Sequence, residues 1–142
     1  MGVLPDAALI DALAALLSGY GTLTLHLAQN NVSITRATVL TDFTEANFSG
    51  YVAQNIGTWA TPALDSVNHR SYAAAPALSF QNTTGAVGNS IYAVYATNAA
   101  GHLVYAEEVA GGPSVPVDMT TSGKTFVYTP TYYQYSFAST SP

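Results

Sequence analysis

The fold class follows most directly from residues 91–109, which read IYAVYATNAAGHLVYAEEV. Two runs rich in β-branched and aromatic residues, Ile91–Thr97 and Leu103–Val109, flank the glycine-containing segment Asn98–His102. This arrangement predicts an antiparallel hairpin. The first run is uncharged, and an exposed strand of this kind tends to pair with other chains. The sequence therefore indicates that this strand is covered, and oligomerisation would cover it.

Similar short runs recur along the chain and are separated by segments rich in Gly, Asn, Pro and Ser. Alternation of leucines in residues 22–27 predicts a strand there, because side chains of a strand point to opposite faces in turn. Further strands are expected over residues 77–81, 115–119, 124–129 and 132–137, with one of the turns at Gly111–Pro113. This spacing predicts a mainly β, antiparallel β-sandwich or jelly-roll-like single domain.

The N-terminal region has the different period of a helix. Pro5 and Asp6 are typical of a first helical turn, and Gly19 and Gly21 of a helix end. Between them lies one apolar stripe, which consists of Leu9, Ile10, Leu13, Leu16 and Leu17. The other side is mostly alanine, so the helix is expected to pack on more than one side, against its own domain or a neighbour. We therefore expect a helix over residues 1–20 and a β-sandwich domain over residues 21–142, as one folding unit.

A second, shorter helix is predicted from the spacing of two acids. Asp42 and Glu45 stand three residues apart, as an N-cap residue and an acid at the third helical position do. The sequence therefore predicts a short helix over Phe43–Phe48.

The charge content is unusually low and excludes some partners. Charged residues make up 8% of the chain, against about 25% in soluble domains. Arg36, Arg70 and Lys124 are the basic residues, and the net charge is −5. Nucleic acids and anionic membranes are therefore not expected as partners. A surface with so few charges is easily desolvated, which favours contact with other subunits; a neutral extracellular-type domain is the alternative.

Two further absences concern export and redox chemistry. No basic residue precedes Arg36, and the apolar run over residues 7–17 is too short to span a bilayer, so no export or anchoring signal is expected. The chain has no cysteine, which excludes disulfides and thiolate metal sites.

No residue pattern predicts catalysis. Glu107 and Glu108 are adjacent, so on a strand they point to opposite faces. The histidines, His26, His69 and His102, lack the spacing of a metal motif and are interpreted as solvated or hydrogen-bonded structural residues. Nucleophile elbows and phosphate-binding glycine motifs are absent. We expect no enzyme activity, no cofactor and no metal.

Three segments match the N-x-[S/T] glycosylation pattern, at Asn31, Asn47 and Asn82. In a chain rich in Asn, Ser and Thr we interpret them as chance matches.

Candidate interface residues come from the helix and from the aromatic side chains. They are Leu9, Leu13 and Leu16 in the helix, and Trp59, Tyr132, Tyr133 and Tyr135 farther along the chain. Aromatic side chains on a β surface stack on sugars, and they also fill β-cores and subunit interfaces. We favour the core and interface interpretation for these aromatics.

Residues 40–51, LTDFTEANFSGY, followed by Trp59 and Pro62, resemble a recurring pattern in small bacteriophage and prophage proteins. Later stretches, at residues 91–98, 101–107 and 123–132, are also similar to that group. The resemblance implies a short helix followed by a β-domain and a structural role in the virion. It brings no catalytic residues.

Low charge and this resemblance together predict a bacteriophage virion structural protein. We expect a capsid decoration or cement protein that forms a homo-oligomer, such as a trimer, and binds the major capsid protein or other virion proteins. Its expected location is the virion, assembled in the cytoplasm of the bacterial host. The alternative is a tail-associated receptor- or carbohydrate-binding module that uses Trp59 or the C-terminal tyrosines.

Overall fold

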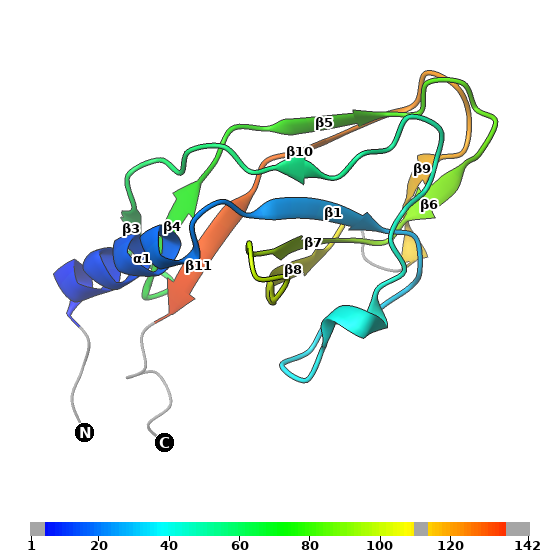
Figure 1. Cartoon of the computed structure of the whole chain (residues 1–142). Coiled ribbons are helices and arrows are strands. Elements are labelled where there is room, and N and C mark those ends of the chain that lie inside the picture. The colour runs from blue at the N-terminus through cyan, green and yellow to red at the C-terminus, as the bar shows by residue number, and fades with distance from the viewer. Residues whose placement is uncertain (1–4, 110–113, 136–142) are drawn as a thin grey trace. The chain divides into compact units, whose positions relative to one another are not determined.

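The computed structural model describes residues 5–109 and 114–135 and is mainly β, with one N-terminal α-helix and antiparallel sheets, as predicted (Figure 1). The chain divides into two compact units. The first unit combines the N-terminal residues through Gly21, Gly57–Ala77 and the residues from Thr129 onward. The second combines Thr22–Ile56 and Leu78–Tyr128. Each unit is described by itself below.

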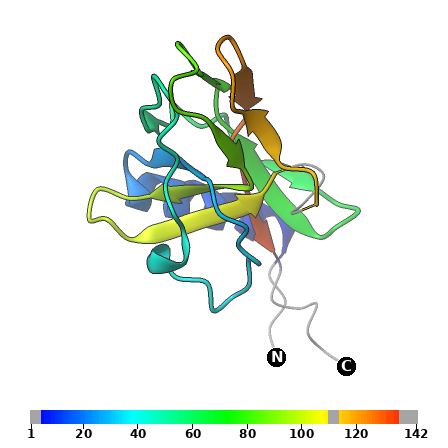
Figure 2. The ribbon, with the colours of Figure 1, turned by 90° about the vertical axis from the view of Figure 1, so that its right-hand side faces the viewer.

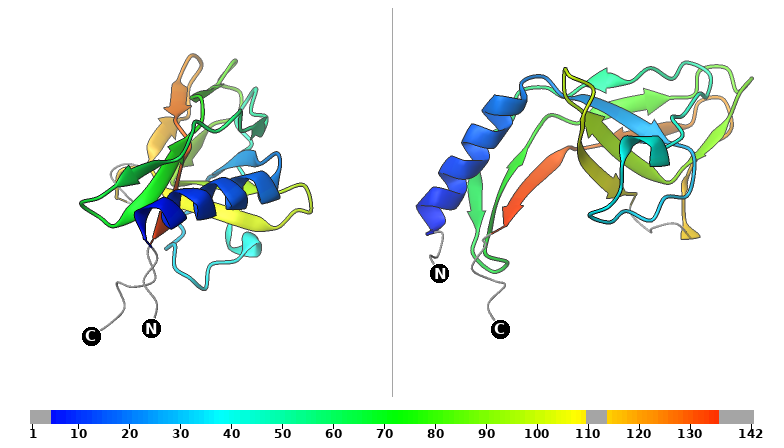
Figure 3. Two further views of the ribbon diagram at one scale, coloured as in Figure 1. Left: turned by 90° about the vertical axis from the view of Figure 1, so that its left-hand side faces the viewer. Right: turned by 60° about the horizontal axis from the view of Figure 1, so that its bottom comes forward.

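The first unit is a helix packed on a three-stranded antiparallel sheet. The helix is α1 (Asp6–Tyr20), and the strands follow the order β11 (Thr131–Tyr135), β4 (Arg70–Ala74), β3 (Ala63–Asp65). Contacts of α1 run to all three strands, and Figure 3 shows the helix lying beside them. The helix thus covers one face of this sheet.

The sequence of α1 explains both its ends and its buried stripe. Asp6 lies in the first turn, and the chain leaves the helix at Gly21, whose φ of 65° is unfavourable for other residues. Leu9, Leu13 and Leu17 recur every fourth residue and are buried. The open question of what the helix packs on is settled: it packs on strands of its own chain.

The described residues of the second unit form three antiparallel sheets. The largest has the order β2 (Gln54–Asn55), β1 (Thr24–Ala28), β7 (Ala93–Thr97), β8 (Leu103–Glu108); β8 is the yellow strand in Figure 2. Two smaller pairs are β5 (Leu78–Gln81) with β10 (Thr125–Tyr128) and β6 (Asn89–Ile91) with β9 (Val117–Met119).

The predicted hairpin over residues 91–109 is confirmed. Strands β7 and β8 pair antiparallel, and the turn closes with the Asn98 N–H donating to the His102 carbonyl at 3.0 Å. The first expected strand is interrupted at Tyr92, so that its start belongs to β6 and its remainder to β7. Because β7 pairs with β1 and β8 and is almost wholly buried, its own sheet covers it. The inference that oligomerisation covers this strand was therefore wrong.

The predicted helix over Phe43–Phe48 was also wrong. A single 3₁₀ turn forms at Leu40–Asp42, where the Asp42 carboxylate accepts from the Val39 N–H at 2.8 Å. Asp42 is thus the last residue of this turn, and its carboxylate caps the start of the turn. The following residues run extended along β1, and Glu45 forms a β-bridge with Ala28.

Most of the other predicted strands are present, with shifted ends. Of the predicted strand over residues 132–137, the last two residues lie outside the described residues, as does the Gly111–Pro113 turn. Strands β2, β3 and β4 were not predicted. The buried positions of β4 are Ser71 and Ala73, so the strand lacks the large apolar side chains that mark strands in sequence.

Candidate binding surfaces

The face of the β11–β4–β3 sheet that points away from α1 carries a tyrosine–arginine cluster. Antiparallel register places Tyr133 opposite Tyr72, and Tyr135 opposite Arg70. On the other side of β4, Asp65 is the partner of Arg70. The exposed fractions of Tyr72, Tyr133 and Tyr135 are 37%, 40% and 54%. Three aromatic rings, one cation and one anion therefore share one face.

Arg70 holds this cluster together. Its Nε donates to Asp65 Oδ2 at 2.9 Å, and its Nη1 donates to the Tyr135 hydroxyl at 2.8 Å. The guanidinium carbon lies 3.9 Å from the centroid of the Tyr133 ring, a cation–π contact. The register of the sheet and the fork of the guanidinium thus fix the positions of the surrounding side chains.

Asp65 is held in its ionised form by two neighbours. Asn68 donates to Asp65 Oδ2 at 2.8 Å, and this bond, followed by that from Arg70, lowers the pKa of Asp65. In return, Asp65 raises the pKa of Arg70. Both groups are charged at neutral pH, and their charges cancel.

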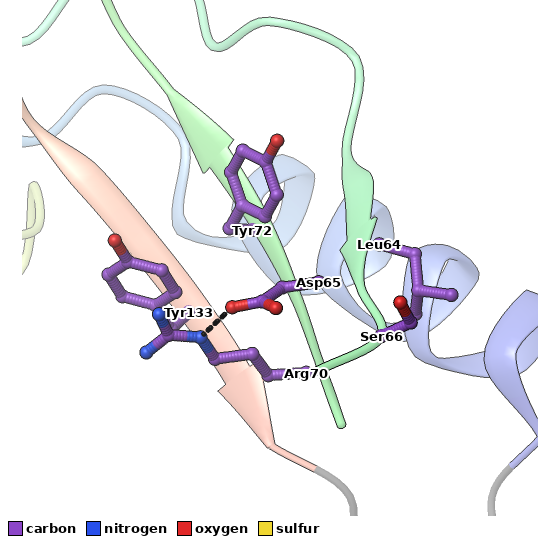
Figure 4. Close-up of a pocket in the computed structure, with 6 residues that line it drawn as sticks. All are labelled: Leu64, Asp65, Ser66, Arg70, Tyr72 and Tyr133. Atoms are coloured by element: carbon purple, nitrogen blue, oxygen red, sulfur yellow. Dashed lines mark hydrogen bonds and ion pairs between the residues drawn. The ribbon is translucent and has the colours of Figure 1, made fainter. Parts of the chain in front are cut away.

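An open depression of about 380 Å³ lies beside this cluster. Its lining consists of Leu64, Asp65, Ser66, Arg70, Tyr72 and Tyr133. In Figure 4 the Arg70 guanidinium lies against the Tyr133 ring and points to Asp65. The depression combines aromatic walls with hydrogen-bond donors and acceptors.

The predicted interface residues all belong to the first unit, but they divide between the two sides of its sheet. Leu9 and Leu13 lie on the buried side of α1, and Leu16 is half-buried. Tyr132 and Trp59 pack against the buried Leu13 cluster. These residues belong to the interior of the unit.

Tyr132 illustrates that interior side. Its ring meets that of Trp59 edge-on at 6.4 Å, and its hydroxyl lies 3.3 Å from the Tyr20 hydroxyl. Burial raises the pKa of Tyr132. Of the predicted interface set, Tyr133 and Tyr135 lie on the outer face.

Sequence reasoning missed the charged and polar members of the outer face. Asp65 and Arg70 flank the turn between β3 and β4. They are an acid and a base five residues apart in a chain with only three basic residues. That pairing was the available signal, but without β3 and β4 in the predicted fold it had no structural context.

The second unit presents an uncharged surface on the β5–β10 pair. Register places Gln81 opposite Thr125 and Ser79 opposite Val127, and these four side chains are exposed. The alternate residues, among them Phe80 and Phe126, turn inward, where these two rings stack at 6.5 Å. Neither strand contains a charged residue.

His26 joins three segments of the second unit. Its Nδ1 lies 2.7 Å from Glu45 Oε1, and its Nε2 lies 3.0 Å from Thr97 Oγ1. Its ring stacks on Tyr95 at 4.8 Å. A hydroxyl, an imidazole and a carboxylate in this order occur in nucleophilic hydrolases.

A catalytic triad also needs donors for an oxyanion. The N–H groups of the adjacent hairpin turn are engaged within it: those of Ala100 and His102 donate to the Asn98 side chain, and that of Gly101 to the Asn98 carbonyl. Glu45 also accepts from the Tyr51 hydroxyl at 2.9 Å. The His26 ring thus connects β1 to Glu45 and to Thr97 and Tyr95 of β7.

Within residues 5–109 and 114–135, no group of three or more His, Asp or Glu side chains is placed to hold a metal ion. In the same residues, no helix is long and apolar enough to cross a membrane.

Comparison of the chain with protein-family models, with curated proteins and with solved structures finds no match.

Proposed function

We propose that the chain is a structural protein of a bacteriophage particle, a capsid decoration or cement protein that associates with itself and with the major capsid protein. The observation that carries this proposal is the uncharged β5–β10 surface. Its exposed residues are Ser79, Gln81, Thr125 and Val127. Such a surface loses few strong hydration interactions when a partner covers it. Strands without charge also invite pairing when left open.

The segment that resembles phage proteins supports the same role. Residues 40–51 form a strap beside β1, in which residues 43–48 follow the 3₁₀ turn and run extended. Within it the Ala46 N–H donates to the Leu27 carbonyl at 2.8 Å. The ring of Phe43, in this strap, stacks on the ring of Tyr95 in β7, with their centroids 4.4 Å apart. These contacts hold the strap on the sheet and stabilise the second unit, which fits a protein with a structural role.

The test is the protein composition of particles purified from cells that carry the gene. We expect the chain in a fixed ratio to the major capsid protein, measured by quantitative mass spectrometry after density-gradient purification. Absence from purified particles would overturn the proposal.

A matched pair of variants tests which surface is used. Val127 is 60% exposed and Val67, in the first unit, is 85% exposed. We expect Val127→Lys to lose self-association and capsid binding, because a lysine ammonium is costly to bury at a contact. Val67→Lys makes the same change elsewhere and should retain both. Equal behaviour of the two variants in light scattering and capsid co-sedimentation would exclude the β5–β10 surface.

The alternative, a tail-associated receptor- or carbohydrate-binding module, is favoured by a different observation, the tyrosine–arginine cluster beside the open depression. In that case the chain is also part of the phage particle, but its binding partner is a receptor or glycan on the host cell.

A further inference from the structure

The depression on the first unit has the composition of a site for a small polar ligand. Binding pockets combine aromatic walls with a few polar groups that orient the ligand. Here the walls are the rings of Tyr72 and Tyr133, whose centroids lie 6.3 Å apart with planes inclined by 42°. Both rings are more than a third exposed, so a ligand can reach them.

The polar groups of the depression retain hydrogen-bonding capacity. A guanidinium has five N–H donors, of which Arg70 directs Nε to Asp65 and one Nη1–H to Tyr135. A carboxylate has about four acceptor positions, and in the described structure Asp65 accepts from Asn68 and Arg70. The exposed hydroxyl of Ser66 also lines the depression. Donors and acceptors thus stand side by side at its edge.

The charges of the depression decide between classes of ligand. Asp65 and Arg70 neutralise each other at 2.9 Å, so the lining offers no net charge to a phosphate, a sulfate or a carboxylate. A purely apolar ligand would remove water from the hydrogen-bonding positions of Asp65 and Arg70 that no protein group fills, which is costly. A ligand with an apolar face and hydroxyl groups around it can pack on the two rings and also form hydrogen bonds with Asp65 and Arg70.

We propose that this depression binds a neutral hexose unit of a surface glycan. The apolar face of the sugar ring packs on Tyr133 and Tyr72, and its hydroxyls exchange hydrogen bonds with Asp65, Arg70 and Ser66. The site lies on the first unit, whereas the proposed assembly surface lies on the second, so the two proposals stand or fall separately.

The position of Trp59 sharpens the assignment. An aromatic sugar platform was one interpretation of Trp59, but its ring packs on Tyr132 beside α1. The exposed rings that meet the depression are those of β4 and β11. Tyr133 therefore replaces Trp59 as the residue whose loss tests sugar binding.

The experiment begins with the full chain on an array of neutral, sialylated and sulfated glycans. Glucose, galactose, mannose and N-acetylglucosamine are then titrated into ¹⁵N-labelled protein. We expect neutral glycans to bind, and the amide shifts to centre on β3, β4 and β11. A flat array, or binding of acidic glycans alone, would overturn the proposal.

Variants then locate the site. Tyr133→Ala should weaken binding by about tenfold or more, and Tyr133→Phe, which keeps the ring, by about threefold at most. Tyr132→Phe changes the same strand on its other face and should bind as the wild type does. Circular dichroism confirms that each variant is folded. Undiminished binding by a folded Tyr133→Ala protein would place the sugar elsewhere and refute this site.

Discussion

At the scale of single residues, Asn82 shows how a polar side chain is built into the second unit. It is fully buried, and its Nδ2 donates to the carbonyls of Met119 and Val87 at 2.9 and 3.0 Å. Its Oδ1 accepts from the Gly85 N–H at 2.8 Å. The side chain thus links the loop between β5 and β6 to β9. Although Asn82 matches a glycosylation pattern, its amide is inaccessible in the folded chain.

We expect Asn82→Ala to lower the free energy of unfolding by about 2–4 kcal/mol, because it leaves two carbonyls and one N–H without their partner. Urea denaturation followed by tryptophan fluorescence and circular dichroism measures this loss. Asn31→Ala, at an exposed asparagine, is the control and should change the value by less than about 0.5 kcal/mol. A similarly small effect at Asn82 would contradict the structural role.

At the scale of elements, the strap over residues 40–51 replaces a strand beside the second half of β1. Strand β2 pairs only with Thr24 and Leu25. Beyond it, the Tyr51 hydroxyl accepts from the Leu27 N–H at 3.1 Å and donates to Glu45. Burial is the main cause that raises the pKa of Tyr51 far above its usual value. A side chain therefore completes the hydrogen bonding of β1.

Removal of that hydroxyl should change the hydrogen exchange of one backbone amide, that of Leu27. We expect Tyr51→Phe to destabilise the chain by about 1–3 kcal/mol, because the Leu27 N–H is left buried without an acceptor. Native-state hydrogen exchange by NMR should show faster exchange at Leu27 than in the wild type, beyond any change at Leu25. Tyr72→Phe, at an exposed tyrosine, is the matched control. Unchanged protection of Leu27 would show that the strap is dispensable there.

The β3–β4 hairpin should have its own pH dependence. The folded state lowers the pKa of Asp65 through Asn68 first and Arg70 second. A lowered pKa contributes stability above the usual aspartate value of about 4, and that stability is lost as the pH falls toward the lowered value. Asp65→Asn should therefore lower the melting temperature at pH 7 and have little effect near pH 3.

Thermal melts between these pH values measure the difference between the wild type and Asp65→Asn. Asp11→Asn, at an exposed carboxylate of α1, controls for the change in net charge. A difference that grew as the pH fell would contradict the arrangement at Arg70.

At the scale of the whole molecule, the division into units explains what the sequence could and could not predict. Local patterns identified α1, β1 and the β7–β8 hairpin, because apolar periodicity and a turn lie within one continuous segment. The first unit joins three separated segments, and nothing local indicates that β11 pairs with β4. The positions of Arg70 and Asp65 on its outer face could therefore not be predicted, although Tyr133 and Tyr135 were among the predicted interface residues.

The sparse charge of the molecule leads to the last prediction, which concerns salt. Screening weakens interactions between exposed charges, and the Debye length falls to about 3 Å at 1 M salt. The proposed contact over β5 and β10 contains no charged residue, so salt should change its association constant very little. We expect a change below about threefold between about 0.05 and about 0.5 M sodium chloride, measured by sedimentation equilibrium. Ammonium sulfate should strengthen association, because it favours burial of surface. Dissociation of the assembly by sodium chloride would instead indicate ion pairs at the contact, and it would contradict an uncharged contact over β5 and β10.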